Sequence, residues 1–172
     1  MSVEQAGDSW TPADAESVPP GSWVHVAPLL RSDFTAETLA ALAHGRRLSF
    51  DGQGLVRRAE PGPLRLDADF DRAMLAHVQI LKLAEEEAEI VGAVDELGVP
   101  EVVVTYGPRG ARVYSNGRWD TVGAWPITAD PTGSGDAFAG AYLAGRAQAL
   151  SPLSAARRAT AVVGALLAGG AA

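Results

Sequence analysis

The chain has 172 residues, of which 47% are hydrophobic and 20% charged, a composition typical of a globular protein and not of a disordered or fibrous one. Its formal net charge of −7 disfavours general binding to nucleic acid or to an anionic membrane, so we expect neither partner. The absence of cysteine excludes disulfides, thiolate metal sites and a cysteine nucleophile. With no long apolar run and no leader pattern, the chain is expected to be soluble and cytoplasmic.

The first half of the chain predicts strands that alternate with helices. Residues 1–20 are polar and contain prolines without an apolar period, so we expect a loose N-terminal lead-in with a short helical turn at most. Periodicity and capping then predict a buried strand at 23–27, a helix at 36–43 behind the cap Thr35, a strand at 46–50, a helix at 69–77, a strand at 78–82 and an amphipathic helix at 85–97.

The second half contains the clearest strand and a hairpin. Residues 101–105 are continuous and β-branched, as in a parallel sheet covered on both faces, and Asn116-Gly117 predicts a type I′ turn. The remaining elements expected are hairpin strands at 111–115 and 118–122 and helices from 133–135 to about 150 and from 154 to 167. This order predicts an α/β fold with a mostly parallel sheet, in one domain at 21–168 with a frayed tail at 169–172.

The segment that points most directly to chemistry is Asp130-Pro131-Thr132-Gly133-Ser134-Gly135-Asp136. Its glycines lead into a helix, which leaves consecutive backbone N–H groups unpaired at the positive end of the helix dipole. Such a turn can hold a phosphoryl group without a side-chain cation, and Asp136 beside it can accept a proton from an attacking hydroxyl. The alternative is an ordinary glycine-rich turn in which Asp136 only stabilises the helix N-terminus.

Extended to residue 141, this segment resembles the C-terminal signature of the ribokinase-like (PfkB) carbohydrate kinases. That signature is usually Asp-Thr-Thr-Gly-Ala-Gly-Asp-x-Phe-x-Gly, from which Pro131 and Ser134 depart. Residues 102–111 look like the Val-Thr-x-Gly-x-x-Gly strand and turn of the same family, and residues 80–88 look like its Lys-Pro-Asn-x-x-Glu segment.

The resemblance implies a ribokinase-like three-layer α/β/α sandwich that lacks the N-terminal part and the lid. It also implies transfer of the ATP γ-phosphoryl group to a hydroxyl of a small sugar, polyol or nucleoside. Carried over by position, Asp136 is the catalytic base. The loop of Gly133, Ser134 and Gly135 leads into the anion hole, which is formed by the backbone N–H groups of Ser134, Gly135 and Asp136.

The same resemblance implies the contacts to the phosphoryl donor. Thr105, Gly107 and Gly110 would line the nucleotide site, and Asp130 and Thr132 would contact a monovalent cation or the phosphates. The plainer alternative is that Thr105 ends a strand and that the two glycines belong to a turn before the hairpin.

The resemblance also implies a metal contact in residues 80–88. Leu83 and Ala84 replace the Pro and Asn of the family segment, whereas Glu87 matches its Glu. Glu87 would orient waters on Mg²⁺, a cation that keeps much of its hydration shell. Alternatively, this glutamate and its neighbours Glu85 and Glu86 are first-turn helix charges, of which at least two lie on a solvated face.

A second candidate for binding follows the strand at 46–50. Asp51, Gln53 and Arg57 lie where a strand ends, and open α/β sheets bind ligands at the carboxyl ends of their strands. The segment resembles the Asp-x-Gln-Gly-x-x-Arg segment of some sugar or polyol kinases of the family, which implies substrate binding. The alternative is a glycine-rich loop with a surface arginine.

The resemblance covers only the C-terminal part of the family pattern, since no Gly-Gly sugar-binding signature or β lid is found. We therefore expect a homodimer or a complementary N-terminal half to complete the sugar site. Two other functions remain open: a non-catalytic nucleotide-binding or regulatory remnant of the same fold, and a Rossmann-type dinucleotide enzyme, although no Gly-x-Gly-x-x-Gly follows the first strand. Neither a Walker-type Gly-x-x-x-x-Gly-Lys loop nor a Gly-x-Ser-x-Gly elbow is present.

Overall fold

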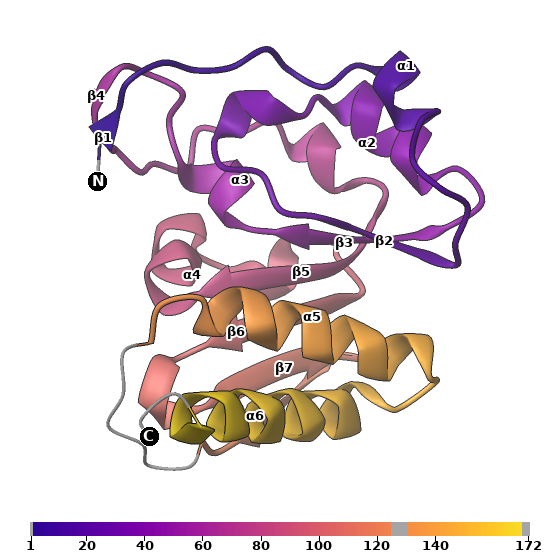
Figure 1. The fold of residues 1–172 in the computed structure, drawn as a ribbon, viewed down its shortest axis with the longest axis vertical. Helices are drawn as coiled ribbons and strands as arrows, with labels where there is room; N and C mark the ends of the chain where they lie inside the picture. Colours follow the sequence, from indigo (N-terminus) through magenta and orange to yellow (C-terminus); the bar gives the residue numbers. More distant parts are fainter. Residues whose placement is uncertain (1, 125–130, 170–172) are drawn as a thin grey trace.

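The structure, a computed structural model, describes residues 2–124 and 131–169. Its main sheet has six strands in the order β2-β3-β5-β6-β7-β8 (Figure 1). The neighbours β2, β3, β5 and β6 run parallel, whereas β7 and β8 form a hairpin whose first strand is antiparallel to β6. The strands are β2 (Trp23–Val26), β3 (Arg47–Asp51), β5 (Val78–Ala84), β6 (Glu101–Thr105), β7 (Ala111–Ser115) and β8 (Arg118–Val122).

Helices cover both faces of this sheet. α5 and α6 lie side by side across one face, and α2, α3 and α4 pack against the other (Figure 1). The predicted three-layer α/β/α sandwich is therefore confirmed. The helices are α1 (Pro12–Ala15), α2 (Ala36–Ala43), α3 (Gln53–Val56), α4 (Glu85–Val91), α5 (Ser134–Ala147) and α6 (Pro152–Gly169), with 3₁₀ turns at Arg31–Asp33, Arg72–Leu75, Val94–Glu96 and Gly107–Arg109.

The core is divided between the two faces by the alternation of side chains along the strands. Phe50 and Leu81 are fully buried in the cluster that includes α2 and α3. Ile80 and Val103 point the other way and pack in a second cluster with α5 and α6. This second layer holds the N-terminus of α5 against the end of the sheet at which the parallel strands finish.

Local signals predicted several boundaries correctly. The Thr35 hydroxyl accepts a hydrogen bond from the Thr38 amide at 3.2 Å and begins α2. Asn116 and Gly117 have φ angles of 51° and 76°, as a type I′ turn requires. The helix predicted at 85–97 is wrong in its second half, because Gly92 adopts a φ of 82° and α4 ends one residue earlier.

Segments with weak periodicity were predicted less well. Within residues 1–20, a capping box between Thr11 and Asp14 begins α1, and Ala15 is buried in the core, so this segment is tied to the domain. β1 (Ser2–Val3) pairs with β4 (Gly62–Pro63) in a separate small sheet.

Two further predictions differ from the structure. The helix expected at 69–77 is only a 3₁₀ turn, which the Asp71 side chain begins by accepting from the Ala73 amide at 2.9 Å. The loop expected after β3 contains the single turn α3. None of the described helices combines the length and the apolar character needed to cross a membrane.

Candidate active site

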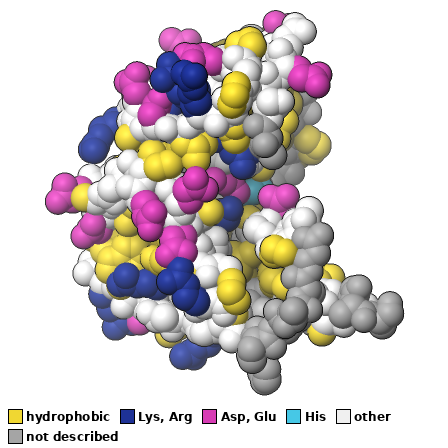
Figure 2. Space-filling view, turned by 90° about the vertical axis from the view of Figure 1, so that its left-hand side faces the viewer, with side chains coloured by type: hydrophobic (Ala, Val, Ile, Leu, Met, Phe, Trp, Pro, Cys, Tyr) yellow, Lys and Arg dark blue, Asp and Glu magenta, His cyan; other side chains and the backbone are white. Residues whose placement is uncertain are grey.

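The candidate site lies where the parallel strands end. The register pairs His25 with Ser49, Asp51 with Lys82, and Ala84 with Thr105, and partners in register share a face of a sheet. His25, Asp51, Lys82 and Thr105 therefore lie on the face that α5 and α6 cover. Figure 2, which views the molecule from this end, shows a histidine beside acidic and basic side chains in a hollow of the surface.

A buried ion pair joins two of these strands. Lys82 Nζ donates to Asp51 Oδ2 at 3.1 Å, and the two residues are only 8% and 2% exposed. The ammonium also lies against α5, since a Cβ built on Gly135 would be 3.5 Å from Nζ. Sequence reasoning missed Lys82 as a site residue. Two signals were available: Lys82 matches the Lys of the Lys-Pro-Asn-x-x-Glu segment, and it is the only lysine of the chain, placed within an otherwise apolar strand.

In the first turn of α5, two backbone amides have no acceptor among the described residues. Gly133 caps the helix at a φ of 77°, and its carbonyl accepts from the Ala137 amide at 3.0 Å. The predicted anion hole needs a correction, because the Ser134 amide donates to the Pro131 carbonyl at 2.9 Å and is already used within the protein. The amides of Gly135 and Asp136 have no hydrogen-bond partner in the described part of the chain. The Asp136 side chain is exposed beside them.

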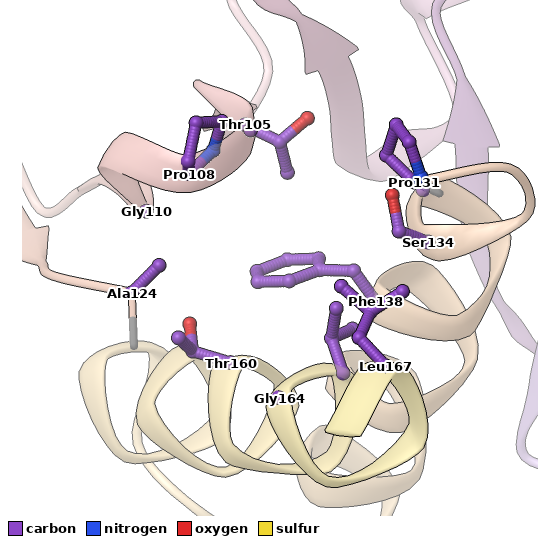
Figure 3. Close-up of a pocket in the computed structure, with 13 residues that line it drawn as sticks. Thr105, Pro108, Gly110, Ala124, Pro131, Ser134, Phe138, Thr160, Gly164 and Leu167 are labelled. Carbon is purple, nitrogen blue, oxygen red and sulfur yellow. The ribbon is translucent and has the colours of Figure 1, made fainter. Parts of the chain in front are cut away.

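A cavity of about 260 Å³ begins at this turn and runs between the β6–β7 connection and α6. Thr105, Gly107 and Gly110, predicted to bind the nucleotide, all line it, together with Ser134 and Gly135. Figure 3 shows Thr105 and Pro108 on one wall, Pro131 and Ser134 on another, Thr160, Gly164 and Leu167 of α6 forming the floor, and the Phe138 ring between them.

The contribution of α6 to this cavity was not predicted from the sequence. Its lining positions Thr160, Val163, Gly164 and Leu167 follow a helical period, a pattern that an ordinary buried helix face would also show. One detail distinguishes them: Thr160 Oγ1 is buried and has no hydrogen-bond partner among the described residues. A buried hydroxyl without a partner costs free energy, so its place in a cavity wall favours a polar ligand atom opposite it.

Gly110 serves the fold as well as the cavity. Its φ is 95°, and a Cβ at this position would lie 2.0 Å from the Val122 carbonyl oxygen. The turn before the hairpin therefore needs glycine for steric reasons. The alternative of a turn glycine therefore fits Gly110, which also lines the cavity; its contact with a nucleotide stays a prediction.

Glu87 is buried at the start of α4. Its Oε2 accepts from the Ala84 amide at 2.7 Å, which caps the helix. Burial raises the pKa of the Glu87 carboxyl, an effect that the Ala84 amide and the nearby Lys82 ammonium oppose. The alternative of a solvated helix charge does not fit this buried carboxylate. Within the described residues, no three histidine or carboxylate side chains gather into a metal-binding group.

The residues predicted to bind substrate are less available than expected. Asp51 uses both carboxylate oxygens within the protein, since Oδ1 accepts from the Gln53 amide at 3.3 Å and Oδ2 from Lys82. Gln53 and Arg57 are half-buried at the two ends of α3, and the charge of Arg57 influences the pKa of Glu87.

The other predicted contacts lie at the edge of the site. Thr132 is exposed in the turn before α5 and does not line the cavity, and Asp130 lies outside the described residues. His25 is half-buried with Nδ1 3.2 Å from the Ser49 hydroxyl. Burial lowers the pKa of His25, and the charges of Asp51, Lys82 and Asp136 also act on it, so all four side chains belong to one electrostatic group.

Sequence comparison identifies related proteins over the second part of the chain. The profile described as "pfkB family carbohydrate kinase" matches residues 63–169. An inositol 3-kinase of Zea mays is 36% identical over 109 residues, which are 63% of this chain and 27% of that protein. An inositol 3-kinase of Oryza sativa subsp. japonica is 34% identical over 113 residues, again 27% of its length.

Structural comparison finds the same fold. A pyrophosphate-dependent kinase in the ribokinase family, complexed with a pyrophosphate analog and myo-inositol, superposes with a TM-score of 0.81 and 23% identity, covering 95% of this chain and 64% of that one. A Burkholderia thailandensis nucleoside kinase in complex with inosine gives a TM-score of 0.70 at 24% identity, covering 90% and 51%. The chain thus spans about a quarter of the curated relatives it matches and less than two thirds of these structures.

The layered fold, with a glycine-rich turn that leads into a helix at the carboxyl ends of parallel strands, defines a ribokinase-type α/β protein. The family profile covers more than half of the chain, and the chain belongs to the pfkB family of carbohydrate kinases.

Proposed function

We propose that this chain carries the phosphoryl-transfer half of an ATP-dependent kinase that acts on a hydroxyl of a small polyol of the inositol class. One observation carries the proposal: the cavity ends at the N-terminal turn of α5, where the Gly135 and Asp136 amides have no acceptor in the described part of the chain and Asp136 is exposed. Phosphoryl transfer depends mainly on positioning and on electrostatic stabilisation, and in this proposal the turn contributes to both.

In the proposed reaction, the oxygen of the acceptor hydroxyl attacks the γ-phosphorus of ATP. A new P–O bond forms, the bond from the γ-phosphorus to the β–γ bridging oxygen breaks, and ADP leaves with the electron pair. Asp136 accepts the proton of the attacking hydroxyl. The amides of Gly135 and Asp136 stabilise negative charge on the transferred group, helped by the positive end of the α5 dipole.

The shape of the cavity supports a nucleotide as donor. Its walls include Pro108, Phe138, Val163 and Leu167, apolar side chains that suit the faces of a purine base. The unpartnered Thr160 hydroxyl could pair with a polar edge of such a base. Pyrophosphate, the donor of the structural relative above, carries no group that would use these apolar walls.

The residues present fit Mg²⁺ in a limited way. Proteins usually hold Mg²⁺ through one or two carboxylates, with substrate phosphates and waters in the other positions. Glu87 is the carboxylate that would orient such waters, and Oε1 is its oxygen not used by the Ala84 amide. Bound there, the ion would neutralise phosphate charge; Asp130 and Thr132 remain proposals for phosphate or monovalent-cation contact.

The acceptor and the partner are also proposals. An inositol-like polyol is favoured by the plant relatives, whose names give inositol 3-kinase activity. Because the structural relatives extend well beyond the matched region, we propose that a second copy or a complementary N-terminal half completes the acceptor site.

Titration calorimetry with ATP, ADP and pyrophosphate, followed by assay of myo-inositol phosphorylation, tests the function. The chain should bind ATP and transfer its phosphoryl group, and Asp136→Asn should lower the rate by about 10²–10⁴-fold while ATP still binds. Glu37→Gln, an exposed acid in the first turn of α2, is the matched control and should leave the rate unchanged. Use of pyrophosphate instead of ATP would overturn the donor assignment.

A second candidate, a non-catalytic nucleotide-binding remnant, is favoured by two departures. Ala84 stands where the family segment has Asn, and the Ser134 amide is used within the protein. ATP binding without turnover, equal in wild type and Asp136→Asn, would establish this function and exclude the kinase.

A further inference from the structure

Hydroxyl side chains line the cavity at three places within the described part of the chain: Thr105, Ser134 and Thr160. Thr105 Oγ1 donates to the Leu83 carbonyl at 3.3 Å and so takes part in the contact between two strand ends. Figure 3 shows Thr160 on the α6 floor and Ser134 on α5, with the Phe138 ring between them. Ser134 is therefore the hydroxyl that lies at the turn proposed to hold the phosphoryl group.

Helix α5 does not use this hydroxyl. Gly133 occupies the N-cap, so Ser134 lies one residue past the position at which a side-chain oxygen caps a helix. Among the described residues the Ser134 hydroxyl has no hydrogen-bond partner. Alanine, which the family signature usually has at this position, is also the better helix former. The fold thus gives no reason for a hydroxyl here.

The helical period directs Ser134 and Asp136 to different sides of the turn. Residues four apart on a helix share a face, and Ser134 and Phe138 both line the cavity. Residues two apart do not face each other, and Asp136 is exposed without lining the cavity. A phosphoryl donor in the cavity would therefore reach the turn on the Ser134 side, and an acceptor hydroxyl would reach it on the Asp136 side.

We propose that Ser134 is a further catalytic residue, whose hydroxyl donates a hydrogen bond to the leaving oxygen of the phosphoryl donor. The proposal rests on the proposed kinase function and deepens it. As the acceptor oxygen bonds to the γ-phosphorus, the bond to the β–γ bridging oxygen breaks, and the electron pair stays on that oxygen. The Ser134 hydroxyl keeps its own proton and stabilises the growing charge, while Asp136 takes the proton of the acceptor hydroxyl.

The hydroxyl also compensates for a backbone donor that the turn has lost. The Ser134 amide donates to the Pro131 carbonyl at 2.9 Å, which leaves the Gly135 and Asp136 amides for the transferred group. Serine hydroxyls serve as donors to developing negative charge in sites of this kind. With the two amides on the transferred group and the hydroxyl on the leaving oxygen, each charge that develops has a donor from the same turn.

The test begins with Ser134→Ala, which removes the donor and leaves no new polar group unpaired. The single-turnover rate of phosphoryl transfer should fall by about 10–100-fold, the range of one hydrogen bond to a charged group. The affinities for ATP and ADP should change by less than about twofold, because the bond strengthens only as charge develops. Ser154→Ala, which changes an exposed serine in the first turn of α6 outside the cavity, is the matched control and should keep the wild-type rate.

A second variant separates the hydroxyl from packing. Ser134→Thr restores a hydroxyl on the same carbon and should recover most of the lost rate. Equal losses in the threonine and alanine variants would assign the effect to packing and overturn the donor role.

The remaining outcomes separate this proposal from the kinase proposal. A folded Ser134→Ala variant with an unchanged rate overturns the role of Ser134 and leaves the kinase intact. Weaker ATP binding at an unchanged rate places the hydroxyl on a phosphate that does not change during the reaction and overturns the catalytic role. A wild type that binds ATP without turnover overturns both proposals. Transfer from pyrophosphate overturns only the nucleotide donor, because a phosphate oxygen is then the leaving atom and the same comparison of variants applies.

Discussion

Two ion pairs under α5 differ in how completely they are satisfied. Where β6 begins, Glu101 accepts from the Tyr142 hydroxyl at 2.5 Å and from Arg146 Nε at 3.0 Å, and Arg146 also donates to the Leu150 carbonyl. Where β3 ends, Lys82 donates to Asp51 and keeps two N–H groups without an acceptor in the described chain. The first network joins α5 to the sheet, and the second is less completely paired among the described residues.

The difference also appears in titration. Burial, with the Glu101 carboxylate beside it, raises the pKa of the Tyr142 hydroxyl, so the first network keeps its protons throughout the physiological range. Near the second pair, burial lowers the pKa of His25 and raises the pKa of Glu87, and the charges of Asp51 and Lys82 act on both residues. A closed polar network stabilises a fold, whereas shifted and incompletely paired groups are typical of functional sites.

The largest expected effect is on the closed network. Glu101→Gln should lower the free energy of unfolding by about 3 kcal/mol, because it leaves the Arg146 guanidinium partly buried without a counter-charge. Urea denaturation followed by circular dichroism measures this loss, with the exposed Glu89→Gln as control. A loss below about 0.5 kcal/mol, the usual range of surface substitutions, would show that this network is not structural.

The open pair should respond differently to removal of both partners. The free energy of unfolding of Asp51→Asn/Lys82→Met should lie within about 1 kcal/mol of the wild-type value. That of Lys82→Met alone should be about 3 kcal/mol lower, because Asp51 stays buried and unpaired. The same denaturation experiment measures both values. If phosphorylation returned together with stability in the double variant, the pair would be structural like the first one.

A moderate, pH-dependent effect is expected at Glu87. Its raised pKa means that the folded state holds the proton more tightly than the unfolded state, so the ionised carboxylate costs stability above the raised pKa. Glu87→Gln should therefore be more stable than wild type by about 1 kcal/mol at pH 7, and the gap should close as the pH falls towards the unfolded value of about 4.3. Unfolding curves between pH 4 and 7 check the sign; a gap that widens in acid would contradict it.

The smallest effect is expected at the cavity wall. Thr160→Val removes the unpartnered hydroxyl at nearly constant volume and should raise stability by about 0.5–1 kcal/mol. If the hydroxyl contacts the base, the same change should weaken ATP binding several-fold and leave pyrophosphate binding unchanged. Thermal unfolding and calorimetry measure the two effects, and unaltered ATP affinity would remove Thr160 from the donor site.

Much of the architecture was predictable because its signals are local. The β-branched run at 101–105, the Asn116-Gly117 turn and the cap at Thr35 act within a few residues, and the elements they predict are present. The prediction of a helix over residues 85–97 was wrong because α4 ends at Val91, where Gly92 takes a positive φ. The apolar period continued beyond this glycine, so the pattern did not show that the helix would end there.

The candidate site was predicted only where its residues form contiguous motifs, because sequence reasoning detects local signals. The glycine-rich turn with Asp136 and the residues Thr105, Gly107 and Gly110 formed contiguous motifs, and these lie around one cavity and its end. The α6 residues belong to no motif that sequence reasoning could use. Lys82 matches the Lys of the Lys-Pro-Asn-x-x-Glu segment, but its pairing with Asp51 joins two strands and is not readable from that segment.

The amino-acid sequence by itself determined the order of strands and helices, the family and the turn that begins α5, since all of these are written in short runs of neighbouring residues. Only the tertiary structure decided that the Ser134 amide is used, that Asp51 is anchored, and that the ammonium of Lys82 meets the first turn of α5. Those outcomes depend on strand register and on the packing of α5, which begins 52 residues after Lys82, and local propensity contains no information on either.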